Sequence, residues 1–157
     1  MTIEEEIKQN NFASSYEKLA FNLIYSCRWL EAFLKKNFAE QGLTMQQYNI
    51  LRILRGSAPV PLSTLQIRER MIDKMSDTSR IVSRLILKKL VTKQASKRDS
   101  RLVDVCITGT GLALLEKLDN IDSKIAAHLG RITEGEALLV SNLLDKMHTA
   151  DNELLLP

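Results

Sequence analysis

The sequence of 157 residues lacks the features of membrane, secreted and disulfide-stabilised proteins. It has no run of about eighteen apolar residues, so we expect no membrane-spanning helix. The N-terminal stretch MTIEEEIKQ is acidic and contains no apolar segment, which is not typical of a secretory signal. The two cysteines, Cys27 and Cys106, lie far apart and suggest no disulfide framework. We therefore expect a cytoplasmic protein whose thiols stay reduced.

The sequence also lacks the residue patterns of an enzyme or a metal site. His128 and His148 are twenty residues apart, with no metal-ligand spacing around either. Residues 15–18 fit the pattern S-x-x-K, but the companion motifs of that hydrolase class are missing. Residues 109–111, Gly-Thr-Gly, are followed by no later glycine that would complete a phosphate-binding loop. We expect no catalytic residue, no metal and no cofactor.

The net charge of +3 conceals a basic segment inside an otherwise acidic chain. Residues 68–101 contain eleven Lys or Arg and four Asp or Glu, a net charge of +7, whereas the rest of the chain carries −4. Such a segment is typical of a surface that binds a polyanion. An anionic membrane would require large apolar residues free to insert opposite the basic ones, but here the apolar side is needed for the core. Nucleic acid is the better partner.

Helix starts are marked by four copies of the capping-box pattern, in which a hydroxyl precedes Glu or Gln by three residues. They begin at Ser14, Thr44, Ser63 and Thr133, and each heads an amphipathic stretch. Gly42 is expected to close the first helix. The pattern predicts a mainly helical protein, with helices over residues 14–39, 44–55, 63–71, 76–90, 110–129 and 133–152.

The segment MSDTSRIVSRL divides sharply between its two helical faces. An apolar stripe faces the core, and the opposite stripe carries only hydroxyls and arginines. A solvated face normally mixes acids with bases, because opposite charges four residues apart support a helix. The exposed face after Asp77 has no acid, so it is suited to a negatively charged partner. The apolar stripe is Thr78, Ile81, Val82, Leu85 and Ile86, and the polar stripe is Ser76, Ser79, Arg80, Ser83 and Arg84.

The periodicity then changes from helical to alternating. VTKQAS and LVDVCIT are rich in β-branched residues and flank the polar KRDSR, which predicts a hairpin. Two short helices followed by a two-stranded ribbon with a basic tip form a winged helix-turn-helix. Residues 63–71 would be the positioning helix, residues 76–90 the recognition helix and KRDSR the wing tip. The expected fold is mainly α with a small β-hairpin wing.

These elements predict contact with double-stranded DNA. An α-helix fits the major groove, where Arg can bind guanine O6 and N7 and Ser can serve either base type. Long basic side chains at a wing tip can enter a narrow minor groove. A solvated basic face would explain two arginines alone, but not their placement between a positioning helix and a basic wing. The residues expected at DNA are Ser63, Thr64, Ser76, Asp77, Ser79, Arg80, Ser83, Arg84, Lys97, Arg98, Asp99 and Arg101.

Three motifs resemble the MarR family of bacterial transcription regulators. The run D-S-R-L-V-D-V-C-I-T-G-T-G from Asp99 to Gly111 is similar to the wing signature D-x-R-x-x-x-x-x-L-T-x-x-G, with Ile107 in place of Leu. S-R-I-V-S-R-L resembles the recognition helix of that family, and G-L-T-M-Q-Q-Y-N-I-L-R-I-L resembles its second helix. The resemblance covers nearly the whole chain. It departs at Lys89, where the family usually has the glycine that eases a left-handed helix end.

The resemblance implies an obligate homodimer that binds a roughly palindromic site and represses nearby genes. Residues 1–41 and 109–157 would form the helical dimerisation region, and residues 42–108 the DNA-binding lobe of a single domain. The long terminal helices also carry more apolar surface than one small winged domain needs. The residues expected in the dimer body include Phe12, Tyr16, Ile121, Ile125, Leu129, Ile132, Leu138, Leu139, Leu143 and Leu144.

The resemblance further implies that a small aromatic compound could release the protein from DNA. Phe21, Tyr25, Trp29 and Phe33 form a row at helical spacing, and Tyr48 and Arg52 lie on the next helix. Aromatic walls with one cationic group would suit an aromatic acid, and a pocket lined by Tyr25, Trp29, Tyr48 and Arg52 is one interpretation. The alternative is that an aromatic row at this spacing packs in a core or a dimer interface.

Two other functions stay open from the sequence. Some relatives sense oxidants through a cysteine, and Arg28 beside Cys27 is a weak indication of this, because consecutive helical residues point to different faces. A winged-helix protein that binds another protein instead of DNA is the second alternative. That adaptor would be expected to lack paired arginines on the recognition helix and a basic wing tip, and this sequence has both.

Overall fold

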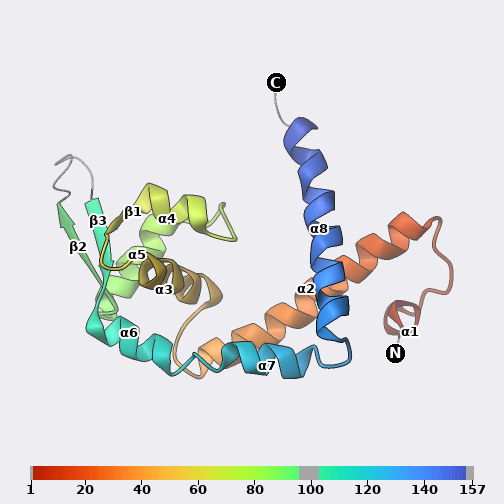
Figure 1. Cartoon of the computed structure of the whole chain (residues 1–157), viewed down its shortest axis with the longest axis horizontal. Coiled ribbons are helices and arrows are strands. Elements are labelled where there is room, and N and C mark those ends of the chain that lie inside the picture. Colours follow the sequence, from red (N-terminus) through yellow and green to blue (C-terminus); the bar gives the residue numbers. More distant parts are fainter. Residues whose placement is uncertain (1, 96–102, 155–157) are drawn as a thin grey trace. The chain divides into compact units, whose positions relative to one another are not determined.

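The computed structural model describes residues 2–95 and 103–154, and the side chains up to residue 148. The predicted fold class is confirmed, because the described chain is mainly helical with one small antiparallel sheet (Figure 1). None of the described helices is both long enough and apolar enough to cross a membrane. In chain order the elements are α1 (Ile3–Ile7), α2 (Ser15–Ala39), α3 (Met45–Ser57), β1 (Leu62–Ser63), α4 (Thr64–Arg70), α5 (Thr78–Leu87), β2 (Val91–Ala95), β3 (Val103–Ile107), α6 (Gly109–Glu116), α7 (Ile121–His128) and α8 (Glu134–Leu154).

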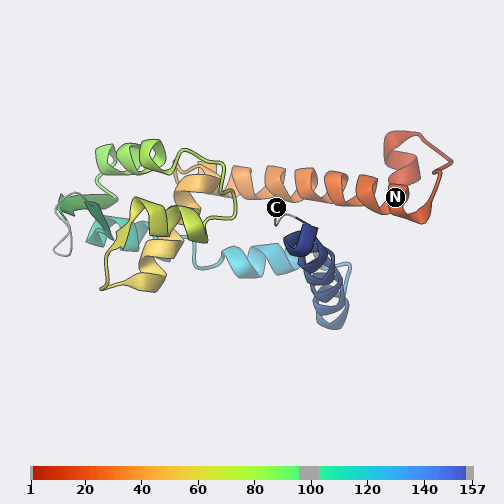
Figure 2. The ribbon, with the colours of Figure 1, turned by 90° about the horizontal axis from the view of Figure 1, so that it is seen from above.

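The chain divides into two compact units, Met1–Leu118 and Asp119–Pro157. Within the first unit α2 is a single straight helix, and α1 lies at its N-terminal end (Figure 2). Lys18 on α2 pairs there with Glu4 on α1, and this contact is the main cause that lowers the pKa of the Glu4 carboxyl. The second unit contains α7 and α8.

Three of the four predicted capping boxes form. At Thr44 and Ser63 the hydroxyl accepts a hydrogen bond from the third helical residue, whose side chain accepts one from the cap backbone. Thr133 and Glu136 bond reciprocally in the same way, and these bonds lower the pKa of the Glu136 carboxyl. Ser14 caps α2, but Glu17 accepts its reciprocal bond from the N–H of Ala13 instead of that of Ser14.

The structure corrects two of the predicted helices and contains two short elements that the sequence did not predict. The recognition helix α5 is shorter than residues 76–90, because Asp77 is its N-cap and the helix ends at Leu87. The single helix expected over residues 110–129 is two helices, since residues 117–120 form a turn at Asp119-Asn120, a residue pair that favours turns. The two unpredicted elements, α1 and β1, are too short to show a clear periodicity in the sequence.

The three strands have the order β1-β3-β2, with both pairs antiparallel. Val105 in the central strand lies opposite Leu62 on one side and Lys93 on the other. Because β1 directly precedes α4, this pairing attaches the start of α4 to the strands of the wing. Around the sheet and the helices α3 to α6 the core of the winged lobe is formed by fully buried side chains, namely Ile50, Leu51, Leu54, Ile67, Val82, Leu85, Val91, Val105 and Leu115.

Two helices of the first unit end in the same hydrogen-bonded motif. After α2 the N–H of Leu43 donates to the carbonyl of Phe38, and the residue between them with positive φ is Gly42. After α5 the N–H of Leu90 donates to the carbonyl of Leu85 at 3.0 Å, and the residue with positive φ is Lys89, at 60°. Both are Schellman ends, whose left-handed position normally favours glycine. Lys89 therefore keeps the backbone geometry of a helix end that usually has glycine. Because lysine has a Cβ, this left-handed backbone conformation costs free energy.

We expect Lys89→Gly to raise the free energy of unfolding by about 1 kcal/mol, because glycine adopts the left-handed conformation without the steric cost of a Cβ. For a chain of this size that corresponds to roughly 2–4 °C in Tm, measurable by thermal unfolding. Lys89→Ala is the matched control, because it removes the same charge but keeps a Cβ, and it should give no comparable gain. A loss of stability in Lys89→Gly would contradict this account of the helix end.

Candidate nucleic-acid interface

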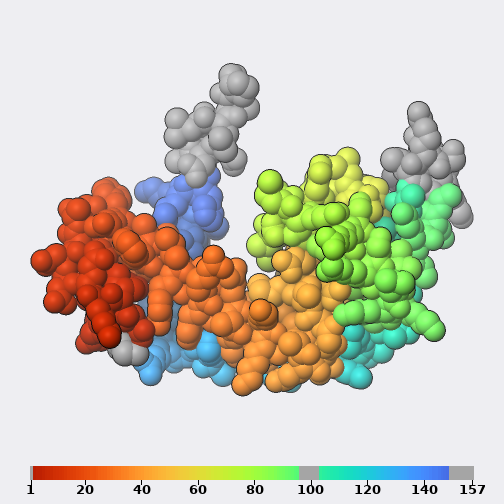
Figure 3. Space-filling view, turned by 180° about the vertical axis from the view of Figure 1, so that it is seen from behind, coloured from red at the N-terminus to blue at the C-terminus, as the bar shows by residue number. Residues whose placement is uncertain are grey.

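The helix α5 presents the two faces that its sequence predicts. Thr78, Val82 and Leu85 are buried against the lobe. The opposite face is exposed and contains Ser79, Arg80, Ser83 and Arg84. In the space-filling view, residues from α4 to β2 form one continuous surface, coloured yellow-green to green (Figure 3). The acid-free face of α5 is therefore part of a surface that a large partner could reach.

The start of α5 assigns structural roles to two residues expected at DNA. The carboxylate of Asp77 accepts a hydrogen bond from the N–H of Arg80 at 3.0 Å and so caps the helix. Ser76 lies before the helix, in a turn where its hydroxyl donates to the carboxylate of Asp73. Neither role prevents contact with a ligand. However, the acceptor capacity of Asp77 is partly used within the protein.

A shallow cleft of about 310 Å³ lies between α4 and the start of α5. The predicted residues Thr64 and Ser79 line it, and Ser63, the N-cap of α4, immediately precedes it in the chain. Arg68 also lines this cleft, and it was not among the residues predicted from the sequence. The sequence feature that could have indicated Arg68 is its position as the first residue of the basic segment 68–101. Hydroxyl groups beside a guanidinium form a surface suited to a phosphate.

A second cleft of about 210 Å³ runs along the other side of α5. Arg80 and Arg84, one helical turn apart, line it together with Thr44, Gln46 and Gln47 at the start of α3. The first turn of α3 therefore lies directly beside the two arginines. On the wing, Lys93 and Gln94 of β2 are exposed. The predicted wing-tip residues Lys97, Arg98, Asp99 and Arg101 lie outside the described residues.

The signature residues Thr108 and Gly111 join the end of α5 to the start of α6. Thr108 donates its N–H to the carbonyl of Leu90 at 3.0 Å and its hydroxyl to the carbonyl of Lys89 at 2.9 Å. The same hydroxyl accepts a hydrogen bond from the N–H of Gly111 and so caps α6. A Cβ on Gly111 would lie 2.3 Å from the carbonyl oxygen of Leu90. These contacts hold the recognition helix and the wing against α6.

The four residues suggested for a ligand pocket do not line the clefts beside α5. Tyr48 stacks on Phe38, with ring centroids 4.2 Å apart. Tyr25, Trp29 and Arg52 are exposed in the single chain. Desolvation raises the pKa of the Tyr25 phenol, and a hydrogen bond to Glu6 acts in the same direction.

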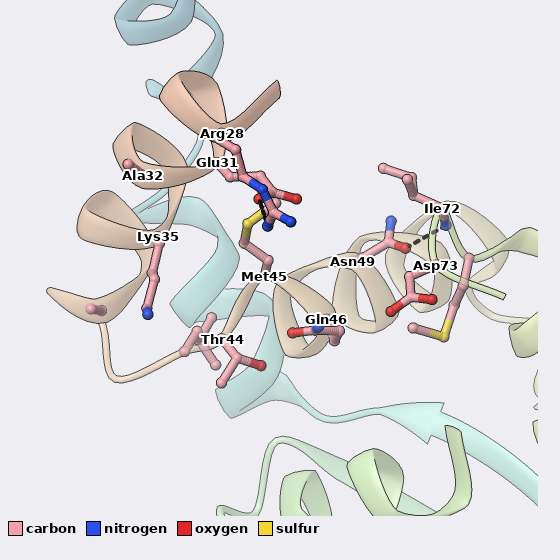
Figure 4. Close-up of a pocket in the computed structure, with 13 residues that line it drawn as sticks. Arg28, Glu31, Ala32, Lys35, Thr44, Met45, Gln46, Asn49, Ile72 and Asp73 are labelled. Atoms are coloured by element: carbon pink, nitrogen blue, oxygen red, sulfur yellow. Dashed lines mark hydrogen bonds and ion pairs between the residues drawn. The ribbon is translucent and has the colours of Figure 1, made fainter. Parts of the chain in front are cut away.

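Another cleft, of about 770 Å³, lies between α2, α3 and the segment that follows α4 (Figure 4). Arg28, Glu31 and Lys35 of α2 line one wall, and Arg28 forms an ion pair with Glu31 at 3.2 Å. Asn49 of α3 and Asp73, in the segment after α4, also line this cleft. This set was not predicted from the sequence, because its residues come from three separate segments and share no periodicity.

Most of the residues predicted for dimerisation are exposed or half-buried within their own unit. In the first unit Tyr16 is 84% exposed, and Phe12 contacts Phe21 with ring centroids 5.9 Å apart. In the second unit Leu139 and Leu143 are more than half exposed. Ile125, Leu129 and Leu144 are half-buried, whereas Leu138 and Ile132 are exposed and Ile121 is buried.

These elements define a winged helix-turn-helix: a positioning helix, a recognition helix and a β-ribbon, joined by the Thr108–Gly111 contacts. No family model matches the sequence. The chain is 28% identical over 116 residues to the HTH-type transcriptional repressor MdtR of Bacillus subtilis, a match that covers 73% of this chain and 74% of the relative.

Two solved structures have the same fold over most of their length. A MarR transcription factor from Planctomyces limnophilus is 28% identical, with a TM-score of 0.65, and the match covers 86% of this chain and 98% of that one. BpsR of Bordetella bronchiseptica, whose DNA binding is regulated by 6-hydroxynicotinic acid, has a TM-score of 0.72 at 24% identity, with 84% and 99% covered. The predicted resemblance is confirmed: the chain has the winged-helix fold of these structures and is similar to MarR-type transcriptional regulators.

Proposed function

We propose that this protein binds double-stranded DNA sequence-specifically, as a homodimer on a pseudo-palindromic operator, and represses transcription there. The observation that carries the proposal is the exposed face of α5, where two serines and two arginines stand without an acid. Arg80 and Arg84 are one turn apart, a spacing that suits successive bases or one base and one phosphate. Thr64 and Arg68 beside the start of α5 are placed to contact the DNA backbone.

The open apolar faces support the homodimer. Several large apolar side chains of α2 and α8 are exposed in the single chain, an arrangement that usually marks an interaction surface. A two-fold axis would present two recognition helices to successive major grooves, which is the geometry that a palindromic site requires. The repressor role is supported by the similarity to MdtR.

A small aromatic acid is the proposed effector. The cleft of about 770 Å³ has the size of a small-molecule site, and apolar side chains line it together with Lys35 and with Arg28, which is paired with Glu31. BpsR, a protein of the same fold, responds to 6-hydroxynicotinic acid. We place the effector of this protein in that cleft instead of among Tyr25, Trp29, Tyr48 and Arg52.

Salt dependence of DNA binding tests this function. We expect the logarithm of the association constant to fall linearly with the logarithm of salt concentration, with a slope of about −0.9 for each phosphate contacted. Fluorescence anisotropy of a labelled duplex measures this slope. A slope near zero would contradict the DNA-binding role and favour the protein adaptor. Repeating the titration with hydroxybenzoate tests the effector, since release of the duplex is expected and an unchanged affinity would contradict the effector class.

A further inference from the structure

We infer that Gln47 and Asn49 of α3 are positioning residues that hold the two ends of the recognition helix and thereby set its sequence selectivity. The inference rests on the proposed DNA-binding function, because it concerns the same helix. Neither residue is among those expected at DNA. Both are nevertheless polar and almost completely buried, at 4% and 7% exposure.

Gln47 holds the C-terminal end of α5. The ammonium group of Lys88, the C-cap residue, donates a hydrogen bond to Oε1 of Gln47 at 3.1 Å and another to the carbonyl of Gly42. The same Oε1 accepts the N–H of Thr44 at 3.2 Å, so the capping box of α3 and the end of α5 share one acceptor. The bonds of Lys88 to Gln47 and Gly42 therefore hold the C-terminal end of α5 against the connection between α2 and α3.

Asn49 holds the segment that leads into α5. Its Oδ1 accepts a hydrogen bond from the N–H of Ile72 at 3.2 Å (Figure 4). The next residue, Asp73, accepts hydrogen bonds from the N–H of Met75 and the hydroxyl of Ser76. Asn49 is therefore linked through a hydrogen-bonded turn to Asp77, which caps the helix.

The two amides can act at opposite ends because of helix geometry. Residues two apart are separated by about 200° around a helix, so the side chains of Gln47 and Asn49 leave α3 in nearly opposite directions. A helix that carries base-reading arginines on two successive turns requires a fixed orientation, since small displacements misplace hydrogen-bonding groups. A buried polar side chain is costly unless it is bonded, so these bonds also favour one arrangement of α3 and α5.

A pair of lysine variants distinguishes a positioning role of Lys88 from a simple effect of its charge. Lys88→Met keeps the aliphatic stem but removes the hydrogen bonds to Gln47 and Gly42, whereas Lys89→Met removes an equal charge from an exposed neighbour. We expect Lys88→Met to lower the ratio of operator affinity to random-duplex affinity by about 3- to 10-fold, with an unchanged salt slope, and Lys89→Met to leave that ratio unchanged. Equal effects of the two variants on both duplexes would overturn the positioning role of this contact.

Asn49 is tested by a pair of variants of similar size. Asn49→Leu removes the acceptor for the Ile72 N–H, and Asn49→Asp retains one. We expect the selectivity ratio to fall by about 3- to 10-fold in Asn49→Leu and to stay near the wild-type value in Asn49→Asp. The Tm of each variant is measured in parallel, because a merely structural role would lower Tm without changing the ratio. That result would overturn the inference.

A measurement without DNA separates this inference from the proposed function. Hydrogen exchange of residues 72–80 should be faster in Asn49→Leu than in the wild type and in Asn49→Asp. If exchange is unchanged in Asn49→Leu, the anchor does not exist, whatever the protein binds. If the wild type binds no duplex but exchange responds as expected, the proposed DNA-binding function fails. The hydrogen bond from Ile72 to Asn49 would then still hold the start of α5, but its role in sequence selectivity would be rejected.

Discussion

Arg84→Ala is expected to lower the affinity for the selected operator by about 10- to 100-fold, because a bidentate contact to guanine contributes about 1–3 kcal/mol of base discrimination. Affinity for a random duplex should fall much less, so that the sequence preference relaxes. Arg84 is exposed on the second turn of the acid-free face of α5 and lines the cleft shared with the start of α3. Competition titrations with operator and random duplexes measure both quantities.

Two further variants calibrate this result. Arg131→Ala removes the same charge from an exposed position of the second unit and should leave both affinities nearly unchanged. Lys97→Ala is expected to weaken binding to every duplex to the same degree, as the loss of a phosphate contact does. If Arg84→Ala also weakens binding equally on every sequence, its base-reading role is wrong.

Gly111→Ala should destabilise the winged lobe by about 3 kcal/mol, because overpacking against rigid backbone costs 1–3 kcal/mol or more. The added Cβ would meet the carbonyl oxygen of Leu90 at 2.3 Å and the side chain of Ile107 at 2.8 Å. Relief would require α6 to move away from the end of α5 and would strain the bonds of Thr108. Chemical denaturation measures the loss.

Gly109→Ala is the matched control for this substitution. Gly109 lies in the same first turn of α6, and a Cβ there would meet nothing within 4 Å. Alanine has the higher helix propensity, so the control should be neutral or stabilising by up to about 1 kcal/mol. Equal destabilisation by both substitutions would show that the close approach of α6 to Leu90 is not what requires glycine.

The sequence predicts the local parts of the structure well because their causes are local. Ser63, Thr44 and Thr133 mark helix starts through bonds to residues only three positions away. The stripe of α5 is visible because burial of Val82 and Leu85 imposes helical spacing. In contrast, α1 and β1 are too short for any period, and the break between α6 and α7 depends on a turn inside an otherwise helical pattern.

The contacts that position the site were not predictable in the same way. Lys88 and Gln47 are 41 residues apart, and Ile72 and Asn49 are 23 apart, so no spacing rule links them. The large cleft combines three segments, and its polar residues are individually ordinary. Tyr48 was plausible as a pocket wall from its type, but its ring stacks on Phe38, which a sequence pattern cannot distinguish from an open aromatic face.

Selection of random duplex DNA by the purified protein, followed by sequencing of the retained fraction, tests the central claim most directly. The account predicts one enriched pseudo-palindrome with half-sites separated by about one helical turn, as two recognition helices related by a two-fold axis require. The same selection with Arg84→Ala should lose preference at defined positions of each half-site. Retention without any motif, or no retention at all, would contradict a sequence-specific dimeric regulator.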